Sequence, residues 1–236
     1  MPSRWETLKV DGDDMRCYLS LPAGPGPYPA VVVIQAAGGV DDTILSFNER
    51  LSNEGYACMA PDLYHREDPN MAGDDFGTRM NRLLDVQVVK DVNTAKDYLK
   101  GLSAVQQERI GITGFCMGGR VVYLKAVHDP ELKAGAIFYG TPINASWGEG
   151  PSPFAQSAKI TCPLLGLFGE EDTSPSPVHV QRMEDELTRL NKVHEFHSYA
   201  GAGHGFMSEG GPSYQEDAAK DAWLKTVAWF DKYLKH

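Results

Sequence analysis

Short apolar runs alternate with longer amphipathic segments along most of the chain. Residues 30–35, AVVVIQ, form a near-continuous apolar run, which is typical of a strand buried on both faces. The longer segments have the period of amphipathic helices, and two of them stop at Gly55 and Gly101. This alternation predicts an α/β fold with a mostly parallel central sheet and helices on both faces.

The same pattern sets the bounds of the expected elements. After a polar start, the expected strands are residues 15–22, 30–35, 56–63, 109–116, 134–140, 162–169 and 193–199. The expected helices are residues 43–54, about 76–100, 117–127, 177–191 and 215–234. Apolar stripes are expected on two of these helices, at Leu83, Val86, Val89, Val92 and Leu99, and at Ala219, Trp223, Val227, Phe230 and Leu234. No repeat or linker interrupts this order, so we expect residues 1–236 to form a single α/β domain.

Composition and charge narrow the class of protein. Hydrophobic residues make up 42% and charged residues 23% of the 236 residues, as in an ordinary globular protein. The formal net charge of -10 argues against nucleic acid or an anionic membrane as partner, because both attract basic surfaces. The N-terminus lacks the apolar run of a secretory signal, and no stretch is apolar enough to span a membrane. We therefore expect a cytoplasmic monomer or weak homodimer that acts on a small molecule.

The four cysteines, Cys17, Cys58, Cys116 and Cys162, lie far apart and show no CxxC spacing. This spacing fits neither a zinc site nor the dense framework of a small disulfide protein, so no metal is expected. Three of the cysteines are expected to be small core hydrophobes. Cys116 differs because of the motif that surrounds it.

The motif around Cys116, Gly114-Phe-Cys116-Met-Gly118, lies between an expected strand and an expected helix. It has the form of a nucleophile elbow, a sharp and strained turn in which flanking glycines prevent collisions between strand and helix. A helix N-terminus favours the thiolate, and the N–H of Met117 would point at the oxygen of a bound acyl group. The alternatives are a buried structural cysteine and a phosphate-binding turn, although the segment lacks the Lys-Ser/Thr of a P-loop.

A catalytic thiol needs a base, and in α/β-hydrolases the chain order is nucleophile, acid, histidine. Of seven histidines, His204 lies in a glycine-rich loop between the last expected strand and the last helix. His65 is the alternative base, because it also follows the end of a strand. Asp172 follows the strand at 162–169 and is either the acid or a turn and cap residue. The complete order favours Cys116, Asp172 and His204 as a triad in which the carboxylate orients the imidazole.

The pocket around this triad is less well determined by the sequence. The second oxyanion donor is expected in the small-residue loop after residues 30–35, with the N–H of Ala37 favoured over that of Ala36. Small residues there also suit a tight turn. Tyr64, Tyr139 and Phe206 lie near strand ends and are candidates to line the pocket, although aromatic residues at such places more often only pack.

The chain resembles the dienelactone hydrolase family over nearly its whole length. The resemblance is carried by VVVIQ and its loop, ACMAPDLYHR, GFCMGGR, FGEED and GAGHGF. It implies an α/β-hydrolase fold, a triad of Cys116, His204 and Asp172, and no cofactor. Members of the family carry a gating glutamate where this chain has Ala36, and an arginine after the catalytic histidine, where this chain offers Ser208.

These two departures affect the expected substrate and the resting state of the thiol. Arg79 or Arg82 is the remaining candidate cation for a substrate carboxylate, and the sequence does not choose between them. Without the glutamate, we hypothesise that Cys116 and His204 form a standing thiolate–imidazolium pair. The expected function is hydrolysis of an ester or lactone through an acyl-cysteine intermediate. A non-catalytic ligand-binding or sensing protein on the same fold and an acyl transferase are the alternatives.

Overall fold

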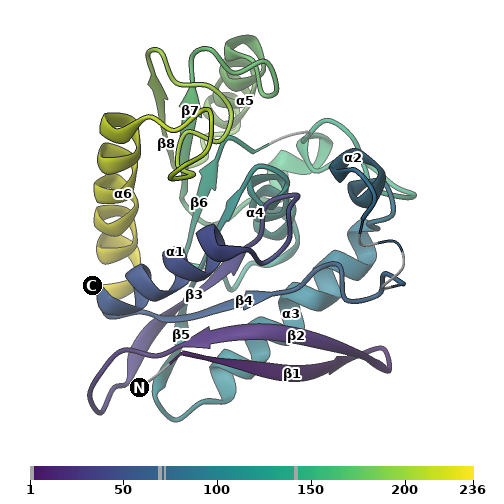
Figure 1. The fold of residues 1–236 in the computed structure, drawn as a ribbon. Coiled ribbons are helices and arrows are strands. Elements are labelled where there is room, and N and C mark those ends of the chain that lie inside the picture. The colour runs from purple at the N-terminus through teal and green to yellow at the C-terminus, as the bar shows by residue number, and fades with distance from the viewer. Residues whose placement is uncertain (1–2, 69–70, 72, 141–142) are drawn as a thin grey trace.

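An eight-stranded sheet forms the centre of the protein (Figure 1). The computed structural model describes residues 3–68, 71, 73–140 and 143–236. The strands are β1 (Arg4–Val10), β2 (Asp13–Ser20), β3 (Tyr28–Ile34), β4 (Ala57–Pro61), β5 (Val105–Phe115), β6 (Ala134–Phe138), β7 (Leu164–Gly169) and β8 (His194–Tyr199). Their order in the sheet is β1-β2-β4-β3-β5-β6-β7-β8. Only the β1–β2 and β2–β4 pairs of this sheet are antiparallel, which confirms the prediction of a mostly parallel sheet.

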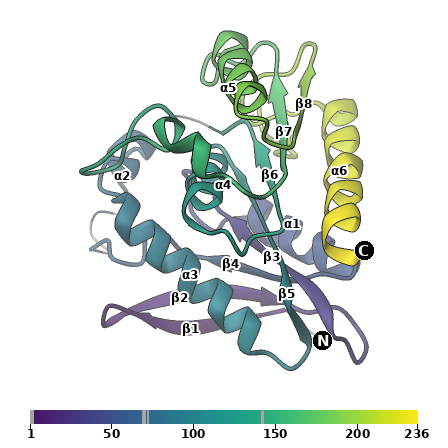
Figure 2. The same cartoon turned by 180° about the vertical axis from the view of Figure 1, so that it is seen from behind.

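Helices cover both faces of the sheet, as the sequence predicts. The helices are α1 (Asp42–Asn53), α2 (Phe76–Met80), α3 (Asp85–Gly101), α4 (Met117–His128), α5 (Pro177–Arg189) and α6 (Glu216–Phe230). Helices α1 and α6 lie on one face, and α3, α4 and α5 lie on the other (Figures 1 and 2). Along β3, Val31 and Val33 pack on the side of α1 and α6. Val32 and Ile34 pack on the side of α3, α4 and α5, so the strand is buried on both faces.

The parallel strands place the functional loops at one edge of the sheet. Strands β3, β5, β6, β7 and β8 run in the same direction, so the loops that follow their last residues meet at that edge. The loop after β3, the β5–α4 turn and the loops after β7 and β8 carry every residue expected to take part in catalysis.

Strand β1 is the first difference from the sequence prediction, which gave the chain a polar start without a strand. The strand pairs with β2 along its whole length at the edge of the sheet. Its side chains are mostly exposed or half-buried on both sides, and only Val10 is buried. Without a buried face, the strand has no apolar alternation for a sequence pattern to detect.

The segment expected as one helix over about 76–100 is two helices, α2 and α3. The second begins at Asp85, whose carboxylate accepts hydrogen bonds of 2.7 and 3.0 Å from the fully buried guanidinium of Arg120. This pairing directs the start of α3 toward α4. As a result Val86, expected on the apolar face, is 65% exposed.

The last helix also ends earlier than expected. Helix α6 stops at Phe230, and the chain continues as a π-helical turn over Asp231–Lys235. Phe230 and Leu234 are buried as expected, whereas Trp223 and Val227 are only half-buried. Within the described part of the chain, no helix combines the length and apolar character needed to cross a bilayer.

Candidate active site

Cys116 lies at the turn between β5 and α4, in the conformation that a nucleophile elbow requires. Its backbone has φ 55° and ψ -118°, a strained combination for a residue with a side chain. The N–H of Cys116 donates to the carbonyl oxygen of Phe138 on the neighbouring strand at 3.0 Å, which fixes the turn to the sheet. The thiol is half-buried, while Cys17, Cys58 and Cys162 are buried as the sequence predicts.

Glycines on both sides of Cys116 allow the close approach of strand and helix. A Cβ on Gly114 would lie 2.4 Å from the carbonyl oxygen of Gly118, so any side chain at position 114 would collide with the start of α4. A Cβ on Gly118 would lie 2.4 Å from the carbonyl oxygen of Gln35, at the end of β3. The elbow is thus pressed against both its own strand and the strand that leads into the Ala36–Gly39 loop.

His204 and Asp172 meet beside the elbow. His204 Nδ1 donates to Asp172 Oδ2 at 2.8 Å, because a carboxylate can only accept. Asp172 is buried, and its other oxygen accepts from the N–H of Ser174 at 2.8 Å. Cys116 lies close enough to the imidazole of His204 to contribute to raising its pKa. The structure therefore brings together the three residues expected to form the triad.

The surroundings of His204 favour its protonated form. Burial lowers the pKa of His204, but the hydrogen bond to Asp172 and the interaction with Cys116 outweigh it and raise the pKa to about 10. The imidazole also packs edge-to-face with the ring of Tyr139, with ring centroids 5.0 Å apart, which holds the imidazole in place. An imidazolium at neutral pH is the partner that a thiolate requires.

The backbone N–H groups of Ala37 and Met117, expected as oxyanion donors, lie in the loop after β3 and at the start of α4. Ala37 is buried in a tight turn closed by the N–H of Gly39, which donates to Ala36 at 3.0 Å. Met117 is the first residue of α4, where helical N–H groups have no partner within the helix. Neither the N–H of Ala37 nor that of Met117 donates to an acceptor among the described residues. Both are therefore available to a ligand.

Tyr64 and Arg79, expected to line the pocket, are bound to the protein itself. The Tyr64 hydroxyl donates to the carbonyl oxygen of Ala37 at 3.1 Å and contacts Met117 Sδ at 3.3 Å. The Arg79 guanidinium lies over the Tyr64 ring, 3.9 Å from its centroid, and pairs with Glu67 at 2.7 Å. Arg82 also pairs with Glu67, at 2.9 Å. Both candidate cations thus share one carboxylate.

The other two aromatic candidates, Tyr139 and Phe206, pack around the loop that carries His204. Tyr139 is buried and has a positive φ of 39°. Phe206 is fully buried between the rings of Tyr139 and Tyr199, at 5.4 and 5.2 Å. Both support the loop that carries His204.

His65, the alternative base, lies elsewhere. Its buried imidazole is 3.3 Å from Asp91, a carboxylate that also pairs with Arg66 at 2.7 Å. This cluster packs between the loop after β4 and α3. His65 therefore has an acid of its own, whereas His204 lies beside Cys116 and Asp172.

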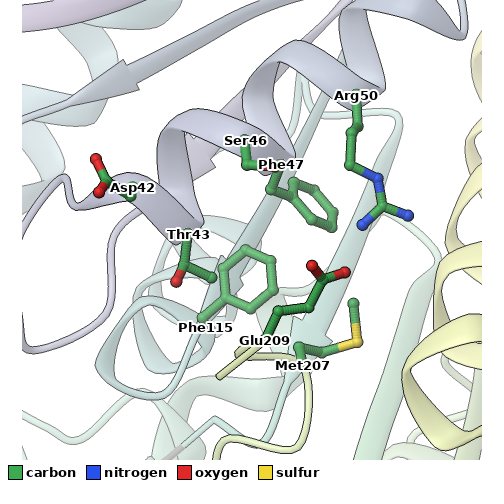
Figure 3. A pocket seen from close by; sticks show the side chains of 8 residues that line it. All are labelled: Asp42, Thr43, Ser46, Phe47, Arg50, Phe115, Met207 and Glu209. Atoms are coloured by element: carbon green, nitrogen blue, oxygen red, sulfur yellow. The ribbon is translucent and has the colours of Figure 1, made fainter. Parts of the chain in front are cut away.

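Two hollows flank the site. One, with a cavity volume of about 210 Å³, lies between α1 and the loop that follows His204 (Figure 3). Phe47 and Phe115 form its apolar wall, with ring centroids 4.8 Å apart, and Arg50 and Glu209 project at its rim. The other, of about 300 Å³, lies beside Tyr64 and is bounded by the residues that follow β4 and by the start of α3.

Sequence reasoning missed Glu67, which holds both candidate cations. Its segment, His-Arg-Glu-Asp, has the charge pattern of an ordinary surface loop, and only the fold shows which arginines reach the carboxylate. Among the residues that the structure describes, no group of three or more His, Cys, Asp or Glu side chains could hold a metal ion.

Comparison with known proteins identifies the relatives of this chain. The family model described as "Dienelactone hydrolase family" matches residues 15–234. A Salmonella typhimurium protein provisionally named a carboxymethylenebutenolidase is 37% identical over 234 residues, which cover 96% of this chain and 86% of the relative. A Bradyrhizobium protein provisionally named a 2-oxo-3-(5-oxofuran-2-ylidene)propanoate lactonase is 29% identical, covering 98% of this chain and 94% of the relative.

Solved structures of other proteins share the fold of this chain. A crystal structure of a Klebsiella pneumoniae protein, provisionally named a dienelactone hydrolase, matches with a TM-score of 0.92 and 33% identity. It covers 98% of this chain, and the match includes 99% of the Klebsiella chain. The fold is also shared with a Pyrococcus horikoshii acylaminoacyl peptidase, at a TM-score of 0.78 and 17% identity over 42% of that longer chain.

Proposed function

This chain belongs to the dienelactone hydrolase family, and from that membership and the geometry of the site we propose that it hydrolyses a carboxylic ester or lactone through Cys116, His204 and Asp172. The enzyme class, a hydrolase of carboxylic ester bonds, follows from the family and its relatives. The observation that carries the triad is the hydrogen bond from His204 to Asp172 beside Cys116, whose sulfur lies at a helix N-terminus.

The first half of the proposed reaction forms an acyl-enzyme. The sulfur of Cys116 attacks the carbonyl carbon of the substrate, and the carbonyl oxygen becomes an oxyanion that accepts hydrogen bonds from the N–H groups of Ala37 and Met117. The C–O bond then breaks, and His204 gives its proton to the departing oxygen. An ester releases an alcohol at this step, whereas the ring-opened hydroxyl of a lactone stays attached to the acyl group.

The second half releases the acid. A water molecule gives a proton to His204 as its oxygen attacks the thioester carbon, and the same two N–H groups stabilise the second oxyanion. Collapse of this intermediate breaks the C–S bond and returns the Cys116 thiolate opposite a protonated His204. Asp172, buried and itself hydrogen-bonded, holds the imidazole in the orientation that both halves need.

The resting enzyme is proposed to hold Cys116 and His204 as a thiolate–imidazolium pair. The pKa of His204, raised to about 10, supports an imidazolium across the neutral range. Ala36, which lies in the loop beside the elbow, has no ionisable group that could hold the thiol in a protonated state. The site therefore needs no substrate-triggered proton transfer before attack.

The proposed substrate class is a lactone or ester that is recognised chiefly by its shape. A lactone is favoured because the Bradyrhizobium relative is named for a lactonase activity. A carboxylate on the substrate would have to compete with Glu67 for Arg79 and Arg82, since both arginines already pair with that side chain.

A comparison of wild-type enzyme with two cysteine variants tests the proposal. The enzyme is assayed on p-nitrophenyl acetate and on a panel of short-chain lactones, beside Cys116→Ala and, as a matched control, Cys162→Ala, which removes a buried thiol. We expect Cys116→Ala to lose turnover at least 10³-fold and Cys162→Ala to keep it. Equal activity in wild type and Cys116→Ala would refute the proposal and favour a ligand-binding protein on this fold.

A further inference from the structure

The two proposed oxyanion donors come from segments that are far apart in the sequence. Ala37 lies in the loop after β3, and Met117 begins α4. An oxyanion hole works only if its donors are held in advance at the spacing that one oxygen atom requires. The two backbones approach each other at Gly118, but that contact involves Ile34 and Gln35 and not Ala37. A further contact is therefore needed to fix the position of Ala37.

The hydroxyl of Tyr64 provides this contact. It donates to the carbonyl oxygen of Ala37 at 3.1 Å, and its oxygen lies 3.3 Å from Met117 Sδ. A hydroxyl has one proton, and a carbonyl oxygen is a stronger acceptor than a thioether, so the hydrogen bond goes to Ala37 and the sulfur is a packing contact. One atom of Tyr64 therefore touches both residues that carry the proposed oxyanion donors.

The ring of Tyr64 is itself held in place. It is 95% buried, with its face covered by the Arg79 guanidinium at 3.9 Å, and that guanidinium is fixed by Glu67 at 2.7 Å. Burial raises the pKa of the Tyr64 hydroxyl to about 12, so the group is a donor at every pH at which the enzyme would be assayed. The position of the hydroxyl is thus set by contacts that do not involve substrate.

We propose that Tyr64 is a positioning residue for the oxyanion hole: its hydroxyl holds Ala37 against Met117 so that both N–H groups converge on the substrate carbonyl oxygen. This inference rests on the proposed function, because it concerns the same reaction. In this role Tyr64 affects the rate of the chemical step and not the binding of substrate.

The variant Tyr64→Phe tests this role because it removes only the hydroxyl and keeps the ring under Arg79. We expect the acylation rate with p-nitrophenyl acetate to fall about 10-fold, less than the 10²–10³ typical of losing a donor altogether, with KM within about two-fold of wild type. Alkylation of Cys116 by iodoacetamide should stay within about two-fold of wild type, because displacement at a saturated carbon builds no oxyanion. A disturbed elbow or triad would slow both reactions.

A matched control is available on α4. The hydroxyl of Tyr123 is buried and hydrogen-bonded to Ser157 at 2.6 Å, so Tyr123→Phe removes the same atom from a comparable setting away from the donors. We expect this control to acylate at the wild-type rate. A wild-type acylation rate in Tyr64→Phe, or a parallel loss of acylation and alkylation, would overturn the proposal. Retained turnover in Cys116→Ala would instead overturn the proposed function, so the two failures are distinguishable.

Discussion

Replacing Gly118 by alanine places a methyl group where α4 meets the end of β3, against the backbone of Ile34 and Gln35. The ideal Cβ would lie 2.4 Å from the carbonyl oxygen of Gln35 and 2.6 Å from that of Ile34. Both neighbours are backbone atoms at the end of β3, so no side chain can rotate away to make room. The helix that begins at Met117 and the loop that begins at Ala36 must therefore move apart.

The size of this movement gives the expected effect. Ordinary contact between such atoms needs roughly 3.5 Å, so the two backbones must separate by about 1 Å. Overpacking of this kind typically destabilises a protein by about 1–3 kcal/mol, which lowers Tm by several degrees in a chain of this length. A misplacement of about 1 Å between catalytic groups costs on the order of 10² in rate, which is the loss of kcat/KM that we expect.

The assay compares Gly118→Ala with Gly203→Ala, using turnover of p-nitrophenyl acetate and thermal unfolding. Gly203 immediately precedes His204, has no positive φ, and a Cβ added there would meet no atom within 4 Å. We expect the Gly203→Ala control to retain wild-type Tm and activity. If Gly118→Ala turned over substrate as fast as wild type, the distance between β3 and α4 would not set the geometry of the site.

Two further substitutions test the charges around the site. Asp172→Asn removes the carboxylate that helps raise the pKa of His204 to about 10, so the imidazolium becomes less stable and kcat falls by on the order of 10⁴. A kcat for p-nitrophenyl acetate equal to that of wild type would contradict this. Glu67→Gln releases Arg79, so kcat/KM for a carboxylate-bearing ester should rise several-fold relative to its neutral analogue. An unchanged ratio for this pair of substrates at low salt would show that Arg79 does not face the bound substrate.

Alkylation reports on Cys116 with little interference from the other thiols. Burial raises the pKa of Cys17 and of Cys162 to about 12, and that of Cys58 well above its usual value. These thiols stay protonated and inaccessible while Cys116, half-buried at the elbow, reacts.

The parts of the site that depend on local spacing can be predicted from the sequence. The elbow is specified by glycines two residues before and after Cys116, and His204 and Asp172 follow strand ends, whose loops must meet in a parallel sheet. Short-range patterns of this kind also predict the buried central strands. Strand β1 escapes prediction because neither of its sides is consistently buried.

The parts that could not be predicted depend on contacts between distant residues. The hydroxyl of Tyr64 reaches across 27 residues to Ala37 and across 53 to Met117, and no spacing rule connects these positions. The break between α2 and α3 likewise depends on Asp85 and Arg120, a pair separated by 35 residues. Such contacts exist only after the sheet has placed its strands.

The acyl-enzyme itself is the most direct test of the account. Wild-type protein mixed with p-nitrophenyl acetate, quenched with acid in the pre-steady state and digested, is examined by mass spectrometry. We expect one acetyl group, labile to hydroxylamine, on the peptide that contains Cys116, and none on that peptide in Cys116→Ala. Turnover with the acetyl group on another side chain, or with no acyl-enzyme at any time, would contradict it.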